Sequence, residues 1–336
     1  MPYPSQQYHG NFESKKERSP GPPRRTNRRA VALPAFGSHR YGSLEEKKLR
    51  RREFLAHSAA ALGAGWLGST NWLATLATRT LPAKFSASDT VTLGNTGIKT
   101  SRLAMGTGTV GFGHHSHQTA LGIQGLCDLL LNGYDHGLRF FDAADSYGSH
   151  AHVAAALKHL ERDKVTILTK SWARDAAAVR ADLDRFRREL GTEYLDICLM
   201  HCLTEPDWTE RFQGVMDVLS EAKQKGIIRA HGCSCHSIEA LRAAAKSPWV
   251  EVDLARINPV GAYMDADPGT VVRILGEMKA AGKAVVGMKI LGQGELRTRQ
   301  DEAIKYALSL GLLDGITIGA ENKAEQEDLI RRIAAA

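Results

Sequence analysis

Short apolar runs alternate with segments of helical period along most of the chain, from Asp89 to the C-terminus. Runs of four to six apolar residues are typical of buried parallel strands, and the longer amphipathic segments between them are typical of covering helices. Eight such alternations in about 245 residues match an α/β fold of the (β/α)8 (TIM) barrel type, for which about 250 residues are typical. Strands are expected at residues 103–106, 138–141, 165–169, 195–200, 229–233, 254–257, 284–288 and 315–318, and helices at 119–135, 150–160, 175–190, 208–225, 237–246, 269–281, 299–311 and 323–334.

Two features at the start of this region bear on the fold. Residues 90–93 and 98–102 flank a turn sequence that contains Gly97, which predicts an N-terminal β-hairpin before the barrel. Residues 106–113 have the glycine spacing GxGxxGxG, which in a doubly wound sheet could form a phosphate-binding turn. No helical segment opens directly after these glycines, so they are weak evidence for that alternative fold.

Charge divides the chain into a basic tail and a nearly neutral remainder. Residues 1–52 hold 13 Lys and Arg against 4 Asp and Glu, a net charge of +9, and the rest of the chain carries −2. A tail rich in Pro, Arg and Ser with few large apolar residues cannot bury enough surface to fold, so residues 1–48 are expected to be disordered. A start codon assigned too far upstream would also explain this tail. The charge balance of the barrel, residues 88–336, gives no reason to expect nucleic-acid binding.

Residues 49–87 have the organisation of an export signal. An arginine run, Arg50-Arg51-Arg52, is followed by Phe54-Leu55 and then by an apolar stretch rich in Ala and Gly. This pattern resembles twin-arginine signals, which implies the twin-arginine export machinery as a partner and a periplasmic location. Polar residues such as His57 and Asn71 interrupt the stretch, so no stable membrane span is expected. The alternatives are an uncleaved anchor facing outward and a cytoplasmic protein.

Polar residues follow the second, third and fourth expected strands, where a (β/α)8 barrel builds its active site. Asp142 and Tyr147 follow the second strand, Lys170 the third and His201 the fourth. A buried lysine needs a partner, and Asp142 can provide it. The ammonium should then stabilise the phenolate of Tyr147 and lower its pKa, while His201 donates a hydrogen bond to a substrate oxygen. This arrangement suits proton donation to a carbonyl that accepts a hydride.

These residues lie in motifs that resemble the aldo-keto reductase family. Phe141 to Gly148, FDAADSYG, resembles FDTAxxYG; TKSW resembles TKxW; YLDICLMH resembles YLDLxLIH; and GIIRAHGCS resembles GKIRAIGVS. The resemblance covers about residues 90–334. It implies a (β/α)8 oxidoreductase that interconverts an aldehyde or ketone and an alcohol with NADP or NAD. It also implies that Asp142, Tyr147, Lys170 and His201 form the catalytic tetrad, with Tyr147 as general acid.

The resemblance implies a cofactor site that departs from the family pattern. Ser234-Cys235 stand where the family has Ser-Asn, and Leu254 stands where it commonly has Gln, so two contacts with the nicotinamide carboxamide are missing. Met288 replaces the stacking aromatic, and its sulfur can still cover a ring face. The residues that follow, Lys289, Gly292 and Gly294, resemble the loop that faces the pyrophosphate.

The implied phosphate-binding segment after the eighth strand includes Gly319, Glu321, Asn322 and Glu325. A carboxylate repels a 2′-phosphate and accepts a hydrogen bond from a ribose hydroxyl, so these residues favour NAD. The family as a whole favours NADP, and the sequence leaves this conflict open. Because the carboxamide contacts are missing and nicotinamide recycling is scarce outside the cytoplasm, a non-catalytic nucleotide-binding sensor or accessory protein is the alternative function.

Histidines and cysteines also gather near the expected rim of the barrel. They could form a transition-metal site, but no pair has a standard chelating arrangement, so no metal is expected and a metal-dependent barrel enzyme is the least favoured alternative. An odd number of cysteines also argues against a disulfide scaffold. The rim residues are His114, His115, His117, His150, His152, Cys202, Cys235 and His236, and the remaining cysteines are Cys127, Cys198 and Cys233.

Overall fold

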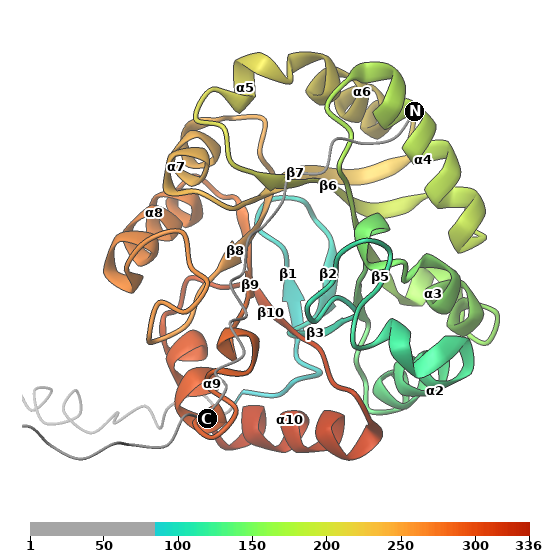
Figure 1. Cartoon of the computed structure of the whole chain (residues 1–336), viewed down its shortest axis with the longest axis vertical. Helices are drawn as coiled ribbons and strands as arrows, with labels where there is room; N and C mark the ends of the chain where they lie inside the picture. Colours follow the sequence, from blue (N-terminus) through green and yellow to red (C-terminus); the bar gives the residue numbers. More distant parts are fainter. Residues whose placement is uncertain (1–84) are drawn as a thin grey trace, which may run out of the picture. The chain divides into compact units, whose positions relative to one another are not determined.

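Eight parallel strands close into a barrel surrounded by helices in the computed structural model, which describes residues 85–336 (Figure 1). The strand order follows the chain, and the last strand closes against the first. The predicted (β/α)8 barrel is therefore confirmed, whereas the expected tail and almost all of the signal segment lie outside the described residues. The barrel strands are β3 (Leu103–Gly106), β4 (Phe140–Asp142), β5 (Thr166–Ser171), β6 (Leu195–Leu203), β7 (Ile228–Cys235), β8 (Val252–Arg256), β9 (Ala284–Met288) and β10 (Gly315–Ile318).

The covering helices follow the predicted segments, with two exceptions. The segment expected as a helix at 119–135 begins with a separate 3-10 turn at Thr119–Leu121, and α2 starts only at Gly122. The single helix expected at 208–225 is two helices, because the backbone of Phe212 leaves the helical region (φ −109°, ψ 26°). This break lets both Trp208 and Phe212 bury their rings. The helices are α2 (Gly122–Asp135), α3 (His150–Leu157), α4 (Ala176–Leu190), α5 (Trp208–Arg211), α6 (Gln213–Gln224), α7 (Ile238–Lys246), α8 (Pro268–Ala280), α9 (Gln300–Ser309) and α10 (Lys323–Ala335).

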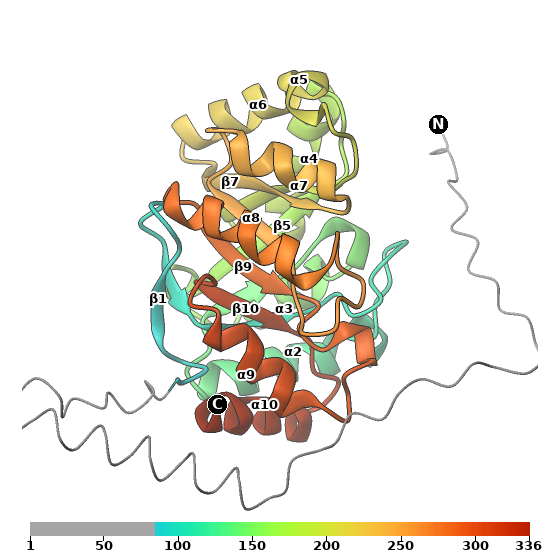
Figure 2. The same ribbon diagram turned by 90° about the vertical axis from the view of Figure 1, so that its left-hand side faces the viewer.

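The predicted hairpin forms and closes one end of the barrel. Its antiparallel strands are β1 (Thr90–Thr92) and β2 (Lys99–Ser101), and Figure 2 shows β1 at one end of the barrel. Leu93 and Ile98, at the hairpin turn, are fully buried among the residues that fill the barrel interior. The hairpin therefore acts as a floor and leaves the opposite, carboxyl end of the strands for a site.

Buried side chains form two layers because successive strand residues point to opposite faces of the sheet. One layer fills the barrel and includes Phe140, Leu168 and Leu199. The other lies between strands and helices and includes Phe141 and Met200. This alternation decides which polar residues can reach the barrel mouth.

Strand ends differ from prediction mainly where a strand carries polar residues. β5 extends to Ser171 and β6 to Leu203, so Lys170 and His201 belong to strands rather than to the loops after them. β7 likewise extends to Cys235. The pairing of β5 with β6 continues through Lys170, whereas the pairing of β6 with β7 shifts register between Met200 and Leu203, next to His201. Among residues 85–336, no helix has the length and apolar character needed to span a membrane.

Candidate active site

Three polar side chains project into the barrel at the carboxyl ends of β4, β5 and β6. Asp142, Lys170 and His201 each stand two residues after a side chain of the barrel interior, so strand alternation turns them inward as well. Their exposed fractions are 5%, 0% and 6%. The structure thus brings together at the mouth the residues that the sequence placed there.

An ion pair between Asp142 and Lys170 forms the base of the site. Lys170 Nζ donates to Asp142 Oδ1 at 2.5 Å and to the carbonyl oxygen of Ala143 at 2.8 Å. Thr317 Oγ1, from β10, donates to Asp142 Oδ2 at 2.8 Å. Burial alone would lower the pKa of Lys170, but the adjacent carboxylate raises that pKa above its ordinary value. Lys170 therefore remains an ammonium inside the barrel.

Tyr147 lies against this ammonium, with Lys170 Nζ 4.7 Å from the centroid of its ring. A 3-10 turn at Asp145–Tyr147 ends at Gly148, whose left-handed backbone (φ 65°) suits glycine. Burial raises the pKa of Tyr147, and the charge of Lys170 offsets only part of that effect. The predicted lowering of this pKa is wrong in its net direction, because the sequence shows the charge beside the phenol but not the depth of its burial.

His201 meets Tyr147 edge-on, with ring centroids 5.6 Å apart and an interplanar angle of 84°. Its Nδ1 lies 3.4 Å from Ser146 Oγ, and the Trp172 ring lies 5.3 Å away between centroids. Burial, followed by the charge of Lys170, holds the pKa of His201 well below its ordinary value. The imidazole is therefore neutral at pH 7 and can donate one N–H hydrogen bond.

The glycine-rich loop after β3 lies over the Tyr147 ring. Thr107 anchors the loop, with its N–H and Oγ1 donating to the carbonyl oxygen of Asp142 at 3.0 and 2.8 Å. A Cβ added to Gly108 would come within 2.2 Å of the Tyr147 ring, and one added to Gly111 within 2.4 Å. Because these glycines lack a Cβ, the loop backbone can pack directly against the Tyr147 ring.

Replacing Gly108 by Ala is expected to lower kcat at least about tenfold, because the added methyl must displace the Tyr147 ring and small misplacements of reacting groups are costly. Turnover at saturating substrate measures the effect. Gly276→Ala in α8 is the matched control, since nothing lies within 4 Å of its added Cβ and its kcat should not change. Equal kcat values for the two variants would contradict the assigned role of the loop.

A cleft of about 450 Å³ leads from the tetrad toward the N-terminus of α10. Its volume falls within the range of small-molecule sites, about 300–1,000 Å³. Tyr147 and Asp142 line one part, and residues after β9 and β10 line the rest. Predicted cofactor-binding residues that line it are Met288, Lys289, Gly294, Gly319, Glu321 and Glu325.

Four residues predicted to bind the cofactor do not line the cleft. Ser234 is buried, and its Oγ accepts the N–H of Cys202 at 3.0 Å. Cys235 faces the outer layer of the core, because β7 continues through it and strand alternation turns its sulfur away from the barrel mouth. Gly292 is a buried turn residue (φ 55°). Asn322 caps α10, with its side chain accepting the N–H of Glu325 at 2.9 Å.

The two carboxylates at the far end of the cleft already have partners. Glu325 accepts the N–H of Glu321 at 2.9 Å and the side-chain amide of Asn322 at 2.9 Å, so it belongs to the cap of α10. Glu321 Oε1 lies 2.7 Å from His117 Nδ1, and both side chains are about half exposed. Glu325 is thus held within the helix cap, and Glu321 is held at the half-exposed His117.

Sequence reasoning missed several residues of the site. Thr317, which holds Asp142, is an ordinary strand-forming residue whose role depends on the closure of β10 against β3. Arg297 and Gln300 line the cleft from the loop before α9 and from its first turn. An arginine shortly after the Gly292–Gly294 turn was the available signal for a second cation beside Lys289.

The rim histidines do not converge on a metal site in the described part of the chain. His114 and His117 hydrogen-bond separately, to the Asp145 carbonyl oxygen and to Glu321. A cluster of Asp145, His150 and Glu189 is explained by Arg185, which donates to both carboxylates. Trp208, in α5 after β6, is fully buried and donates to the carbonyl oxygen of Ala240 in α7.

A closed parallel barrel with Asp, Tyr, Lys and His at its mouth defines a (β/α)8 enzyme suited to carbonyl and alcohol chemistry. The model of the aldo/keto reductase family matches residues 102–310, and the chain belongs to that family. Members of this family are NAD(P)-dependent oxidoreductases that act on carbonyls and alcohols.

The curated proteins that match this chain are only distantly related to it in sequence. An NADH-specific methylglyoxal reductase from Escherichia coli is 25% identical over 214 residues, which are 55% of this chain and 65% of the relative. The aldo-keto reductase YhdN from Bacillus subtilis is 27% identical over 44% of this chain and 47% of its own. The chain thus spans about half to two thirds of these relatives.

Two bacterial aldo-keto reductase structures share the barrel. One from Pseudomonas aeruginosa is 20% identical with a TM-score of 0.62, covering 75% of this chain and 97% of its own. The holo form of AKR11C1 from Bacillus halodurans is 16% identical, also with a TM-score of 0.62, covering 74% of this chain and 92% of its own. At these identities, the likeness concerns the fold alone.

Proposed function

We propose that the chain reduces a small aldehyde or ketone with NADH, or oxidises the alcohol, and that Tyr147 is the general acid. The observation that carries this proposal is the contact between Tyr147 and the buried Lys170–Asp142 pair, with His201 at the edge of the phenol ring. The site contains a phenol held against a fixed ammonium and next to a neutral hydrogen-bond donor. These are the groups that carbonyl reduction needs.

Each residue has a separate task in this mechanism. Tyr147 is protonated at neutral pH, as an ordinary phenol is, and burial raises its pKa further, so it holds a proton to give to a carbonyl oxygen that gains charge. The ammonium of Lys170 stabilises the phenolate left behind, and Asp142 keeps that ammonium in place. His201 supplies a second hydrogen bond to the same oxygen and orients it.

The cleft fits a nicotinamide nucleotide. Lys289 and Arg297 line it, and neither has an ion pair among residues 85–336, so both can meet the phosphates. Burial, followed by the charge of Arg256, lowers the pKa of Lys289 to about 8, and the residue remains largely cationic at neutral pH. Met288 can cover one face of the ring through its sulfur. When bound, the nucleotide supplies the hydride for the carbonyl carbon.

A preference for NADH is part of the proposal. Carboxylates of Glu321, Glu325 and Asp328 line the far end of the cleft, where they would repel a 2′-phosphate and where Glu321 could accept from a ribose hydroxyl. The Escherichia coli relative that is named an NADH-specific methylglyoxal reductase makes methylglyoxal a reasonable first substrate to test.

Substrate-dependent loss of NADH absorbance tests this function in the purified full-length chain. We expect turnover of methylglyoxal or of another carbonyl in a panel of small aldehydes and ketones. A parallel titration follows tryptophan fluorescence, which nucleotide binding should quench because Trp172 lies beside His201. Failure to bind either NADH or NADPH would overturn the proposal.

A second candidate, a nucleotide-binding sensor or accessory protein, is favoured by the missing carboxamide contacts. Cys235 faces away from the mouth, and Leu254 packs in the barrel interior, so neither supplies the polar group that the family pattern has there. Saturable nucleotide binding without turnover across the carbonyl panel would support this candidate over the reductase.

Replacing Glu321 by Lys is expected to raise the ratio of kcat/KM for NADPH to that for NADH at least about tenfold. Charge reversal turns repulsion of a 2′-phosphate into attraction, and at short range this exceeds about 1.4 kcal/mol. Glu327→Lys, on α10 but outside the cleft lining, is the control for general charge. An unchanged ratio in Glu321→Lys would remove Glu321 from the determinants of cofactor choice.

We also propose export by the twin-arginine machinery, on the strength of the arginine run and the apolar stretch after it. Conservative replacement of Arg51 and Arg52 by Lys should retain the protein in the cytoplasm, as cell fractionation would show. Replacement of Lys47 and Lys48 by Gln should leave its location unchanged. A cytoplasmic location of the unmodified chain would refute export.

A further inference from the structure

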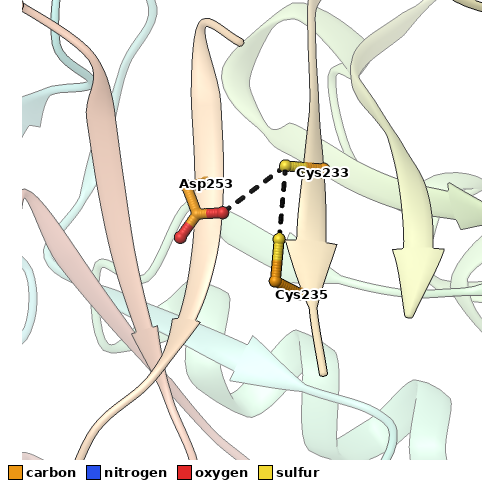
Figure 3. A group of neighbouring side chains, drawn as sticks. All are labelled: Cys233, Cys235 and Asp253. Atoms are coloured by element: carbon orange, nitrogen blue, oxygen red, sulfur yellow. Dashed lines mark hydrogen bonds between the residues drawn. The ribbon is translucent and has the colours of Figure 1, made fainter. Parts of the chain in front are cut away.

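The side chains of Cys233, Cys235 and Asp253 point toward one another (Figure 3). They lie on the outer face of the barrel wall, and none of them lines the cleft. The cysteines are two residues apart on β7, so strand alternation points both sulfurs to the same side. Asp253 lies on β8, in register with Cys233. All three are almost completely inaccessible, with exposed fractions of 0%, 1% and 0%.

The two spacings that involve Cys233 Sγ match those of a zinc site, and all three ligand atoms lie within 4.8 Å of one another. The two sulfurs are 3.9 Å apart, and Cys233 Sγ lies 3.5 Å from Asp253 Oδ1. Tetrahedral zinc, with Zn–S of about 2.3 Å and Zn–O of about 2.0–2.2 Å, separates two sulfurs by about 3.8 Å and a sulfur from an oxygen by about 3.5 Å. A disulfide would require about 2.05 Å, and both thiols are free.

Asp253 is poorly compensated without a cation. Among residues 85–336, its buried Oδ2 has no hydrogen-bond partner, and Oδ1 accepts only from the thiol of Cys233, which is a weak donor. An acidic side chain in such surroundings is strongly unfavourable unless it is neutralised or coordinates a metal.

Charge balance favours a divalent metal at this point. Two thiolates and one carboxylate carry −3, and zinc reduces this to −1. The buried ammonium of Lys283 donates to the carbonyl oxygens of Ala244 and Ser247, and its field acts on both Cys233 and Asp253. Together with zinc it brings the group to neutrality, whereas monovalent copper would leave a negative charge. Thiolates with a carboxylate also suit zinc among common metals.

We propose that Cys233, Cys235 and Asp253 bind Zn²⁺ as its protein ligands, in a site that ties β7 to β8. On binding, both thiols lose their protons to solvent, together with any proton held by Asp253, so affinity rises with pH. The site is structural, and it does not depend on the reductase function proposed above.

The proposed zinc site is connected to the barrel mouth through Ser234. Ser234 lies between the two cysteines and faces the other side of β7, where its Oγ accepts the N–H of Cys202 at 3.0 Å. Cys202 follows His201 on β6. A metal that fixes the outer face of β7 therefore also steadies the strand end that carries His201.

Metal analysis of the full-length protein, freed of metal and then dialysed against Zn²⁺, tests the site. We expect stoichiometric zinc, a higher Tm than in the metal-free protein, and a thiolate-to-metal charge-transfer band when Co²⁺ replaces zinc. Asp253→Asn and Cys235→Ser should weaken zinc binding at least about tenfold and lose the gain in Tm. Cys198→Ser alters another buried cysteine, on β6, and should retain both.

Asp253→Asn keeps the shape of the side chain, so it separates loss of metal from loss of folding. If the wild-type protein shows neither stoichiometric zinc nor a cobalt–thiolate band, the proposal is wrong and Asp253 is a neutral buried acid. Zinc binding that survives both substitutions would assign the metal to other residues. A mass of the wild-type protein lower by two hydrogens would show that the two cysteines form a disulfide instead. Each of these results overturns the site.

Discussion

Replacing Tyr147 by Phe is expected to lower kcat by about 10²- to 10⁴-fold, the usual contribution of a general acid. The ring still packs beneath Gly108 and Gly111 and against Lys170, so the shape of the mouth is preserved. Only the proton donor is lost. Nucleotide affinity, measured by fluorescence quenching, should therefore change by less than about twofold, while single-turnover reduction slows by the same factor as kcat.

Tyr306→Phe provides the control for this substitution. Tyr306 is a partly buried phenol on α9 that packs on the outer core and does not line the cleft. Its removal should leave kcat unchanged. If Tyr147→Phe kept wild-type turnover, Tyr147 would not be the proton donor and the proposed mechanism would fail.

Replacing Lys170 by Met is expected to destabilise the protein by about 3–5 kcal/mol and to abolish measurable turnover. The substitution leaves Asp142 buried with only Thr317 as a side-chain donor, and an uncompensated buried charge has a cost of this size. Activity falls as well, because no ammonium remains to stabilise the phenolate of Tyr147. Urea denaturation and steady-state kinetics measure the two effects separately.

A double variant distinguishes structural from catalytic loss. Asp142→Asn combined with Lys170→Met removes both charges and leaves a neutral amide beside Thr317, so stability should recover by more than half of the loss. Turnover should stay absent. Recovered activity in this double variant would mean that Lys170 acts only by neutralising Asp142.

The barrel could be predicted because the pattern that indicates each strand lies within a few consecutive residues of the sequence. Parallel strands covered on both faces are continuous apolar runs, and eight of them at regular spacing leave few alternative folds. Strand ends were harder to place, because Lys170 and His201 are polar residues on strands. Lys170 pairs with Asp142 of β4, and His201 lies beside Ser146 in the turn after β4, so the apolar pattern along the chain ends before the strand does.

The residues Asp142, Tyr147, Lys170 and His201 could be located from the sequence. Contacts that depend on closure of the barrel, and pKa shifts that depend on burial, could not. Thr317 reaches Asp142 only because β10 pairs with β3. Cys235 was expected at the cofactor, since the strand was predicted to end at Cys233. Once β7 continues through Cys235, alternation places its sulfur on the outer face. The pKa of Tyr147 depends on burial, which no motif reports.

The hairpin floor also decides how this enzyme can be attached to a support. Ala87 accepts the N–H of Leu103, so the described chain enters beside the amino end of β3, at the end of the barrel closed by Leu93 and Ile98. A linker or fusion partner joined at this point is attached at the face opposite the cleft. An immobilised preparation tethered there would keep its catalytic mouth toward the solution, and the orientation of the barrel would be set by the tether.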